Sequence, residues 1–443
     1  MSLLRASQVP GPTPGPRIDR YAWYVLGVFV VVTTFNTADR YILSILLPDI
    51  KREFGLSDAM LGFLVGPAFA VFHTLAGLPI ARWADRGVRR SIVAGGLFLW
   101  SAFTALCGLA QTFWQLLLSR MGVAVCEAAG AAPAQSLLAD YFPPERRATA
   151  MAVFGTGGIV GMGLGLVVGG YVTQHFGWRY AFFVFGLPGM ALAFVLRATV
   201  REPVRGRSEG LAAGGSESAL QVVRFLVRLP AYRHIVLAAS FHAFAGYGAG
   251  IWYPTFLVRV YEMDRFEVGT VMMLAGPLMS AIGALAGGRL ADGLGSRDVR
   301  WYMWLPGAAA LAALPFAAGF LLWPEDVALE VGGRQVLPAL LILCPASMLG
   351  GFWSGPTIAM VLGLAKPHMR ALSAALLLMT YNLMGLGLGP YFVGLLSDGL
   401  EPRFGVDAVR YALLVVALAH VAGSLHNALA ARTLAADLRA KEV

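Results

Sequence analysis

The sequence predicts an all-α membrane protein with twelve transmembrane helices in two related six-helix bundles. Of its 443 residues, 58% are hydrophobic and 13% are charged, whereas a soluble domain carries about 25% charged residues. Apolar runs near the length of about 20 residues that a spanning helix requires recur along the chain. Sequence landmarks also repeat between the two halves, which indicates duplication of a bundle.

The apolar runs define the expected helices, and a longer polar interval separates the sixth run from the seventh. The first six runs are 21–47, 57–81, 90–110, 112–138, 147–172 and 178–198. The second six are 233–257, 267–290, 300–323, 336–362, 371–396 and 408–434. Because the number of runs is even, both termini are expected on one side of the membrane.

The segments outside these runs suggest how the chain is divided. Residues 1–20 are rich in proline and glycine and predict a disordered tail, and residues 435–443 form a second tail. The interval 199–232 predicts a flexible linker followed by an amphipathic helix at the membrane surface, since Arg224 and Arg228 lie one turn apart. The two expected bundles are therefore 21–198 and 233–434.

Basic residues are unevenly distributed between the two faces of the membrane. Of 34 lysines and arginines, 24 fall on the face that carries both tails and 8 on the other, while Arg40 and Arg120 lie within spans. Basic loops stay in the cytoplasm, so we expect both termini to be cytoplasmic. We also expect a monomeric protein of a bacterial inner membrane. This distribution explains the net charge of +9 without a nucleic-acid partner.

Two charged residues, Arg120 and Glu127, lie inside the fourth span. A charge at bilayer depth costs about 2.5–3.5 kcal/mol on insertion scales, so it normally faces a protein interior or a water-filled path. Their spacing of seven residues places both on one helix face, and Pro133 predicts a bend beyond them. A translocation path and a structural ion pair are both open interpretations at this point.

Depth along the helices predicts which buried charges meet. Asp39 in the first span and Arg120 in the fourth both lie about 12 Å from the outer surface, so they can pair if their helices are neighbours. Glu127 lies about 10 Å deeper on the Arg120 face. We therefore expect Arg120 to alternate between the two carboxylates as a proton relay. Arg40 is expected to hold an anionic substrate group or to pair elsewhere, with Asn36 one turn away.

Isolated polar residues in other spans are further candidates for substrate binding. They are His73, His242, Tyr381 and Asn382. Histidine can titrate near neutral pH, but a hydrogen bond within the bundle is the alternative explanation. The sequence contains neither a phosphate-binding loop nor Cys/His clusters with metal-ligand spacing. We therefore expect no enzyme activity, no metal and no cofactor.

Two pairs of landmarks form the internal repeat. The loop ARWADRGVRR at 81–90 follows the second span, and GRLADGLGSR at 288–297 follows the eighth. The charged and glycine residues of these two loops that we expect to be functional are Asp85, Arg86, Arg89, Arg90, Gly288, Asp292 and Arg297. The fifth and eleventh spans carry small residues that permit close helix packing. These are Gly161, Gly165, Gly169, Gly170, Gly389 and Pro390.

These landmarks resemble those of the major facilitator superfamily over essentially the whole chain. The two loops are similar to the cytoplasmic loop motif of that family, although Ala81 and Gly87 depart from it in the first copy. The resemblance implies that the loops tether helices and act as a cytoplasmic gate. The glycine pattern at 161–170 resembles the antiporter motif of the family, with Leu166 where a proline is expected. The resemblance implies the major facilitator fold.

Within that superfamily, the combination of Asn36, Asp39 and Arg40 with Arg120 and Glu127 resembles the spinster-like branch. That branch implies proton-linked transport of lysolipids or sphingoid phosphates. We therefore expect a proton-coupled secondary transporter of an amphipathic organic anion that works by alternating access. A proton symporter for a small organic anion such as a sugar acid is the alternative within transport. A membrane sensor that binds a ligand without moving it is the alternative outside transport.

Overall fold

A computed structural model of the chain describes residues 19–204, 219–324, 329–331, 334–336 and 338–440. The helices of the first half are α1 (Arg20–Phe54), α2 (Asp58–Val65), α3 (Pro67–Arg86), α4 (Arg89–Leu109), α5 (Phe113–Glu127), α6 (Ala131–Tyr141), α7 (Pro144–Phe176) and α8 (Trp178–Thr199). The short helix α9 (Ala219–Arg228) follows. It buries Val222 and Leu226 against residues of the second half.

The second half starts with α10 (Pro230–Val260) and contains several broken helices. Its elements to the first hairpin are α11 (Arg265–Met273), η1 (Leu274–Leu278), α12 (Met279–Gly295), α13 (Trp301–Leu321), β1 (Leu329–Val331) and β2 (Arg334–Val336). The remaining elements are α14 (Ala339–Gly350), α15 (Ser354–Leu364), η2 (Pro367–Met369), α16 (Arg370–Asn382), η3 (Leu383–Leu388), α17 (Gly389–Phe404), η4 (Gly405–Asp407), α18 (Ala408–Ala417) and α19 (Ala419–Ala440).

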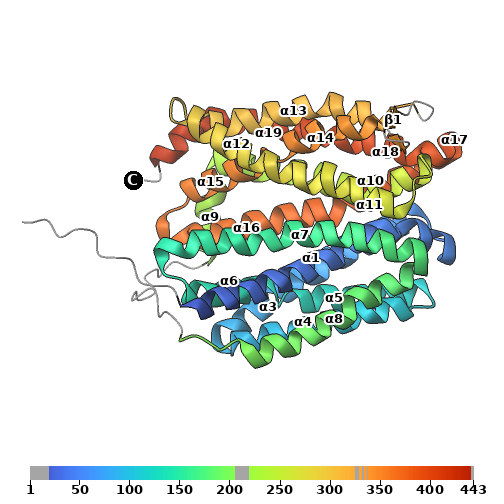
Figure 1. Ribbon diagram of the computed structural model, residues 1–443. Helices are drawn as coiled ribbons and strands as arrows, with labels where there is room; N and C mark the ends of the chain where they lie inside the picture. The colour runs from blue at the N-terminus through green and yellow to red at the C-terminus, as the bar shows by residue number, and fades with distance from the viewer. Residues whose placement is uncertain (1–18, 205–218, 325–328, 332–333, 337, 441–443) are drawn as a thin grey trace, which may run out of the picture.

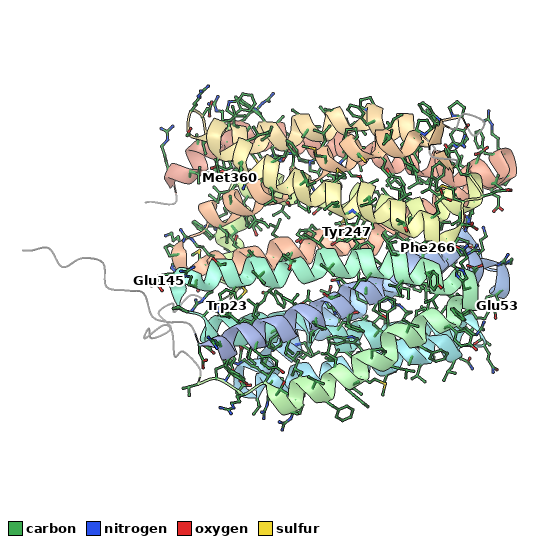
Figure 2. The ribbon with its side chains drawn as sticks, in the orientation of Figure 1. Trp23, Glu53, Glu145, Tyr247, Phe266 and Met360 are labelled. Atoms are coloured by element: carbon green, nitrogen blue, oxygen red, sulfur yellow. The ribbon has the colours of Figure 1, made fainter. Side chains whose placement is uncertain are left out.

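The helices lie side by side in two layers, with the blue-to-green first half below and the yellow-to-red second half above (Figure 1). The start of α1 and the end of α19 lie at the same end of the molecule, called the terminal face below. The end at which α1 passes into α2 is called the opposite face. Figure 2 shows Trp23 and Glu145 at the terminal face and Glu53 and Phe266 at the opposite face.

The described residues contain eleven stretches that are long and apolar enough to cross a membrane. The first ten correspond to the first ten predicted spans. The last, Pro367–Arg439, is 73 residues long and turns at Gly405, whose φ of 55° lies in the left-handed region that favours glycine. This stretch supplies two spans, so the fold has twelve spanning helices and the predicted fold class is confirmed.

A short antiparallel hairpin interrupts the helical fold between α13 and α14. Strands β1 and β2 pair Leu329 with Val336 and Val331 with Arg334. The predicted tenth span, 336–362, therefore begins too early. Pro338 occupies the N-cap position, and the helix starts at Ala339, because proline fits the start of a helix but cannot continue a strand ladder.

The first helix continues beyond its predicted end at residue 47. Helix α1 runs through Pro48 to Phe54 and ends at Gly55, whose φ is 62°. A proline inside a helix leaves the carbonyl four residues earlier without its usual partner. That carbonyl belongs to Ser44, and the hydroxyl of Thr255 on α10 donates to it at 3.5 Å. A hydroxyl from the second half of the chain thus replaces the backbone donor that Pro48 lacks.

Glycines allow helices to approach each other closely at the predicted packing positions. Three glycines of α7 face α1, where an added Cβ would meet α1 atoms. They are Gly161 against Thr34, Gly165 against Ala38 and Gly169 against Ile42. A side chain at Gly170 would meet the Arg265 backbone of α11, in the other half. In the second half, Gly389 lies against the Phe244 carbonyl, and the Pro390 carbonyl accepts a 2.8 Å hydrogen bond from the Trp252 indole.

Candidate functional site

The first buried ion pair of the site joins α1 to α5. The Arg120 guanidinium lies 2.7 Å from one carboxylate oxygen of Asp39. The hydroxyl of Thr104 on α4 donates to the other oxygen, also at 2.7 Å. Both charged side chains are 2–3% exposed, so the pair is enclosed by protein. The contact predicted from depth along the helices is present.

The second ion pair joins the neighbouring residue of α1 to the end of α5. Both Nε and Nη2 of Arg40 lie 2.7 Å from Oε2 of Glu127. The other oxygen, Oε1, is buried and has no hydrogen-bond partner in the described structure. In this conformation Arg120 pairs with Asp39, and Arg40 contacts Glu127. The expected alternation of Arg120 between the two carboxylates stays a prediction. The Arg40 side chain is 28% exposed and that of Glu127 is 0%.

An aromatic ring from α3 packs against both cations. The Phe69 ring centroid lies 4.8 Å from the Arg40 guanidinium and 5.5 Å from that of Arg120. Such cation–π contacts are worth about 0.5–2 kcal/mol, the larger values applying to desolvated sites. The His73 ring stacks on Phe69 at 5.5 Å, and its Nδ1 lies 3.1 Å from the Ala124 carbonyl. His73 therefore supports the ion pairs and is not among the residues that line the cavity described below.

A break in the fourth span fixes the position of Glu127. Helix α5 ends at this residue and α6 begins at Ala131. The predicted bend is confirmed, and it lies just before Pro133, because a proline clashes with the carbonyl four residues earlier. A carboxylate at a helix C-terminus is disfavoured by the helix dipole. The Arg40 cation offsets this unfavourable interaction.

A cavity of about 500 Å³ lies mostly within the second half. Apolar side chains from both halves make up much of its wall, among them Met162, Leu166 and Met272. Tyr41 and Tyr247 line it at the boundary between the halves, and both tyrosines lie within electrostatic range of Arg40. Arg40 is itself not among the lining residues. The cavity therefore has an apolar body and one end near Arg40, marked by Tyr41 and Tyr247.

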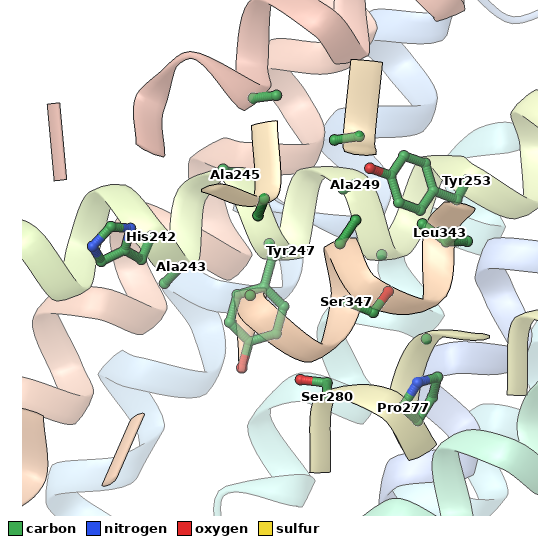
Figure 3. Close-up of a pocket in the computed structure, with 18 of the residues that line it drawn as sticks. His242, Ala243, Ala245, Tyr247, Ala249, Tyr253, Pro277, Ser280, Leu343 and Ser347 are labelled. Carbon is green, nitrogen blue, oxygen red and sulfur yellow. The ribbon is translucent and has the colours of Figure 1, made fainter. Parts of the chain in front are cut away.

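Two of the predicted polar candidates line this cavity. Tyr381 lies there with its ring 5.7 Å from that of Trp353. His242 lies on α10, on the same helix as Tyr247 and Tyr253 (Figure 3). Two other candidates, Asn36 and Asn382, are not among the residues that line the cavity. Their predicted role in substrate binding finds no geometric support in this conformation.

A chain of polar side chains connects the cavity wall to the interior of the second half. Nδ1 of His242 lies 3.0 Å from Nδ1 of His420, and its Nε2 lies 2.9 Å from Nδ2 of Asn427. Sequence analysis missed His420 and Asn427, which both lie on α19. A signal existed, since polar residues in an apolar run were noted at other spans but not in the twelfth.

The repeated loops at the terminal face differ in their contacts. Arg89 is buried and lies 2.6 Å from Asp140 and 2.8 Å from Glu202. Glu202 also accepts from the Arg90 backbone amide at the start of α4. Asp85 is exposed, and Glu202 takes the position beside the α4 N-terminus. Arg86 is exposed as well.

The second copy of the loop has a different polar contact. The Tyr302 hydroxyl donates to Asp292 at 2.8 Å. Gly288 has open space around it, and Arg297 is exposed. The two loops are therefore equivalent in sequence position but not in their contacts. Their gate role stays a prediction.

At the opposite face, bidentate ion pairs connect the two halves. Arg265 donates to both oxygens of Asp49 at 2.6 and 2.7 Å. Arg259 likewise donates to both oxygens of Asp58 at 2.7 Å. Asp398 of α17 accepts from the Asp58 amide at 2.7 Å at the start of α2, where the helix dipole favours a carboxylate. The sequence analysis did not identify this network.

Comparison with known proteins places the chain in a family. The family model described as Major Facilitator Superfamily matches residues 29–390. An MFS-type efflux pump of Mycolicibacterium smegmatis is 34% identical over 411 residues, which cover 92% of each chain. The sphingosine-1-phosphate transporter SPNS2 of Xenopus tropicalis is 28% identical over 395 residues, covering 85% of this chain and 74% of that protein.

A solved structure shows the same architecture. A bacterial homolog of the human lysosomal transporter Spinster, in an inward-facing and unoccupied conformation, superimposes with a TM-score of 0.84 and 29% identity. The match covers 96% of this chain and 99% of that one. These relatives are transporters or efflux pumps rather than enzymes. The chain belongs to the major facilitator superfamily of membrane transporters and resembles its spinster branch.

Proposed function

We propose that this transporter couples protons to the movement of an amphipathic organic anion by alternating access. The observation that carries the proposal is the Arg40–Glu127 pair, in which a fully buried carboxylate holds a partly exposed guanidinium. A proton on Glu127 removes its charge and weakens its hold on Arg40. The guanidinium is then available for a phosphate or carboxylate, which it binds bidentately.

The Asp39–Arg120 pair has a different role in this proposal. It is enclosed by protein and its carboxylate has a second hydrogen-bond donor in Thr104. We infer that it holds α1 against α4 and α5, so that Arg40 and Glu127 face each other. Asp39 and Arg120 would influence coupling through position and charge, while Glu127 carries the transported proton.

The form of the cavity supports an amphipathic substrate. Its walls combine an end near Arg40 and Tyr247 with an apolar body formed by residues such as Met162, Leu166 and Met272. An anionic head and a hydrocarbon tail complement these two parts. The relative named as a sphingosine-1-phosphate transporter carries a ligand of this chemical class.

The ion pairs at the opposite face support an inward-facing state. Asp49–Arg265 and Asp58–Arg259 tie the halves together at that face. The basic-residue asymmetry predicts that the terminal face is cytoplasmic, so the tied face would be the outer one. The similarity to a solved inward-facing structure agrees with this assignment.

Reconstituted protein provides the test of the proposal. Uptake of sphingosine 1-phosphate, octadecyl phosphate and gluconate into liposomes would be measured with and without an imposed pH gradient. We expect the two lipid phosphates to be transported, with accumulation that depends on the gradient. Transport of gluconate alone would favour a symporter of small anions. Lipid-phosphate transport that does not depend on the pH gradient would contradict proton coupling.

A further inference from the structure

Four histidines form two cross-helix pairs between α10 and α19. His242 meets His420 through their Nδ1 atoms at 3.0 Å, and His234 meets His426 in the same way at 2.9 Å. Only the first pair is among the residues that line the cavity. The described structure therefore contains two pairs of matching geometry, of which one can touch a substrate.

The contact with Asn427 assigns the proton positions in the cavity pair. An amide Nδ2 is a donor only, so Nε2 of His242, 2.9 Å away, accepts. A neutral imidazole carries a single N–H, which in His242 is then on Nδ1 and donates to Nδ1 of His420. The remaining proton of His420 lies on Nε2. The hydrogen-bonded chain Asn427–His242–His420 thus leaves an N–H donor on His420, which lines the cavity.

The surroundings of the pair favour neutral imidazoles. No carboxylate contacts either ring within the described part of the chain, and a buried charge without a partner is costly. His242 is 1% exposed, and a side chain at Gly423 would collide with its ring. Gly423 and the Asn427 contact therefore hold the ring of His242 in place, which in turn positions His420.

The histidine pair and Tyr247 line the same cavity. His242 and Tyr247 are five residues apart on α10, which corresponds to about 7.5 Å along the helix. Tyr247, like Tyr41, marks the end of the cavity near Arg40. This separation along α10 is compatible with a substrate hydroxyl that lies a few bonds away from the anionic group.

We propose that His420 is a specificity-determining residue that donates a hydrogen bond to a hydroxyl near the anionic head of the substrate, with Asn427 and His242 as positioning residues. This inference rests on the proposed function. It narrows the proposed amphipathic anions to those that carry a hydroxyl beside the head group.

The test uses two probes that differ by one hydroxyl: 1-O-octadecylglycerol 3-phosphate and its 2-deoxy analogue. Affinities of the purified full-length protein would be measured by thermal-shift titration at fixed detergent concentration. We expect the wild type to prefer the hydroxylated probe by roughly threefold to tenfold, the range of one hydrogen bond. His420→Phe should abolish this preference by weakening binding of the hydroxylated probe only, whereas His420→Gln, which keeps an N–H donor, should retain part of it.

Two further variants separate the role of the Asn427–His242–His420 hydrogen bonds in specificity from their effect on general stability. His426→Phe disrupts the matching pair away from the cavity and should leave the preference unchanged. Asn427→Leu removes the group that sets the proton positions and should reduce the preference. If the phenylalanine variant is unstable, His420→Leu serves in its place.

The possible failures are distinguishable. Equal binding of both probes by the wild type, or an unchanged preference in His420→Phe, overturns this inference and leaves the proposed function standing. A His426→Phe effect as large as that of His420→Phe also overturns it. Absence of binding by either probe contradicts the proposed amphipathic substrate, and this inference falls with it.

Discussion

Nε and Nη2 of Arg40 both lie 2.7 Å from a single oxygen of Glu127, and the other oxygen of this buried carboxylate has no hydrogen-bond partner within the described structure. The two side chains come from residues 87 positions apart in the sequence. The second oxygen can accept a proton without first losing a hydrogen bond. This asymmetry is the basis of the first prediction.

Glu127→Gln should uncouple substrate binding from pH. In the wild type, protonation of Glu127 and binding of an anion at Arg40 favour each other, because linkage is reciprocal. Anion affinity should therefore rise as pH falls. The neutral glutamine should keep the high affinity at all pH values and lose accumulation driven by a pH gradient. Octadecyl phosphate affinity measured from pH 5.5 to 8.5 checks this, with Glu145→Gln at the exposed terminal face as control.

An unchanged pH dependence in folded Glu127→Gln protein would contradict the assignment of the transported proton to this residue. The Asp39→Asn variant then becomes the next candidate. It would be expected to alter coupling only if Asp39 itself exchanges protons.

Arg120→Ala should act first on stability. It leaves the Asp39 carboxylate buried without its cation, and removal of one partner of a buried pair costs about 3–5 kcal/mol. Arg120→Lys should recover part of that loss. The double variant Asp39→Asn, Arg120→Met should be more stable than Arg120→Ala, because no charge is left unpaired. Thermal unfolding of the four purified proteins measures the effect, and an Arg120→Ala protein of normal stability would show that the pair does not hold the bundle.

Arg259→Ala should loosen the opposite face. This change removes a bidentate ion pair that joins the halves, so the outward-open population should increase. Arg179→Ala is a matched control, since Arg179 pairs with Glu53 at the same face but within the first half. Distances between spin labels at Ser57 and Asp264, which are exposed at the opposite face, would report the opening. Equal behaviour of the two variants would indicate that the ion pair does not bias the equilibrium.

Gly161→Val should destabilise the protein by at least about 1–3 kcal/mol, the usual range for overpacking. An added Cβ at this position meets the Thr34 carbonyl of α1, and backbone cannot move aside as a side chain can. Gly155, in the same helix, has open space around it. Gly155→Ala should therefore be neutral or stabilising by up to about 1 kcal/mol. Thermal unfolding in one detergent compares the two substitutions, and similar losses for both would argue against close packing of α7 on α1.

Both tails and the interval 199–232 should face the cytoplasm. A cysteine introduced at Ser208 should not react with an impermeant maleimide added to intact cells, because basic segments stay inside. A cysteine at Ser57, which is exposed at the opposite face, provides the positive control. Ready labelling at position 208 would reverse the proposed orientation.

The sequence by itself determined the family, the spanning helices and the Asp39–Arg120 contact. Hydrophobic length is a local property, since each span must bury its own backbone hydrogen bonds in the lipid. The depth of a charge also follows from its position along a helix. Glycines such as Gly161 were recognisable because close helix packing leaves a pattern of small residues.

Only the tertiary structure decided which arginine pairs with Glu127. Sequence spacing gives the depth and face of a residue on its own helix, but a long guanidinium can reach any acceptor that neighbouring helices bring near. Arg40 rather than Arg120 contacts Glu127 at the end of α5, and Phe69 of α3 lies against both cations. The links at the opposite face and the His242–His420 contact likewise join residues about 180 to 340 positions apart. Such contacts depend on how two bundles pack, and no local pattern records that packing.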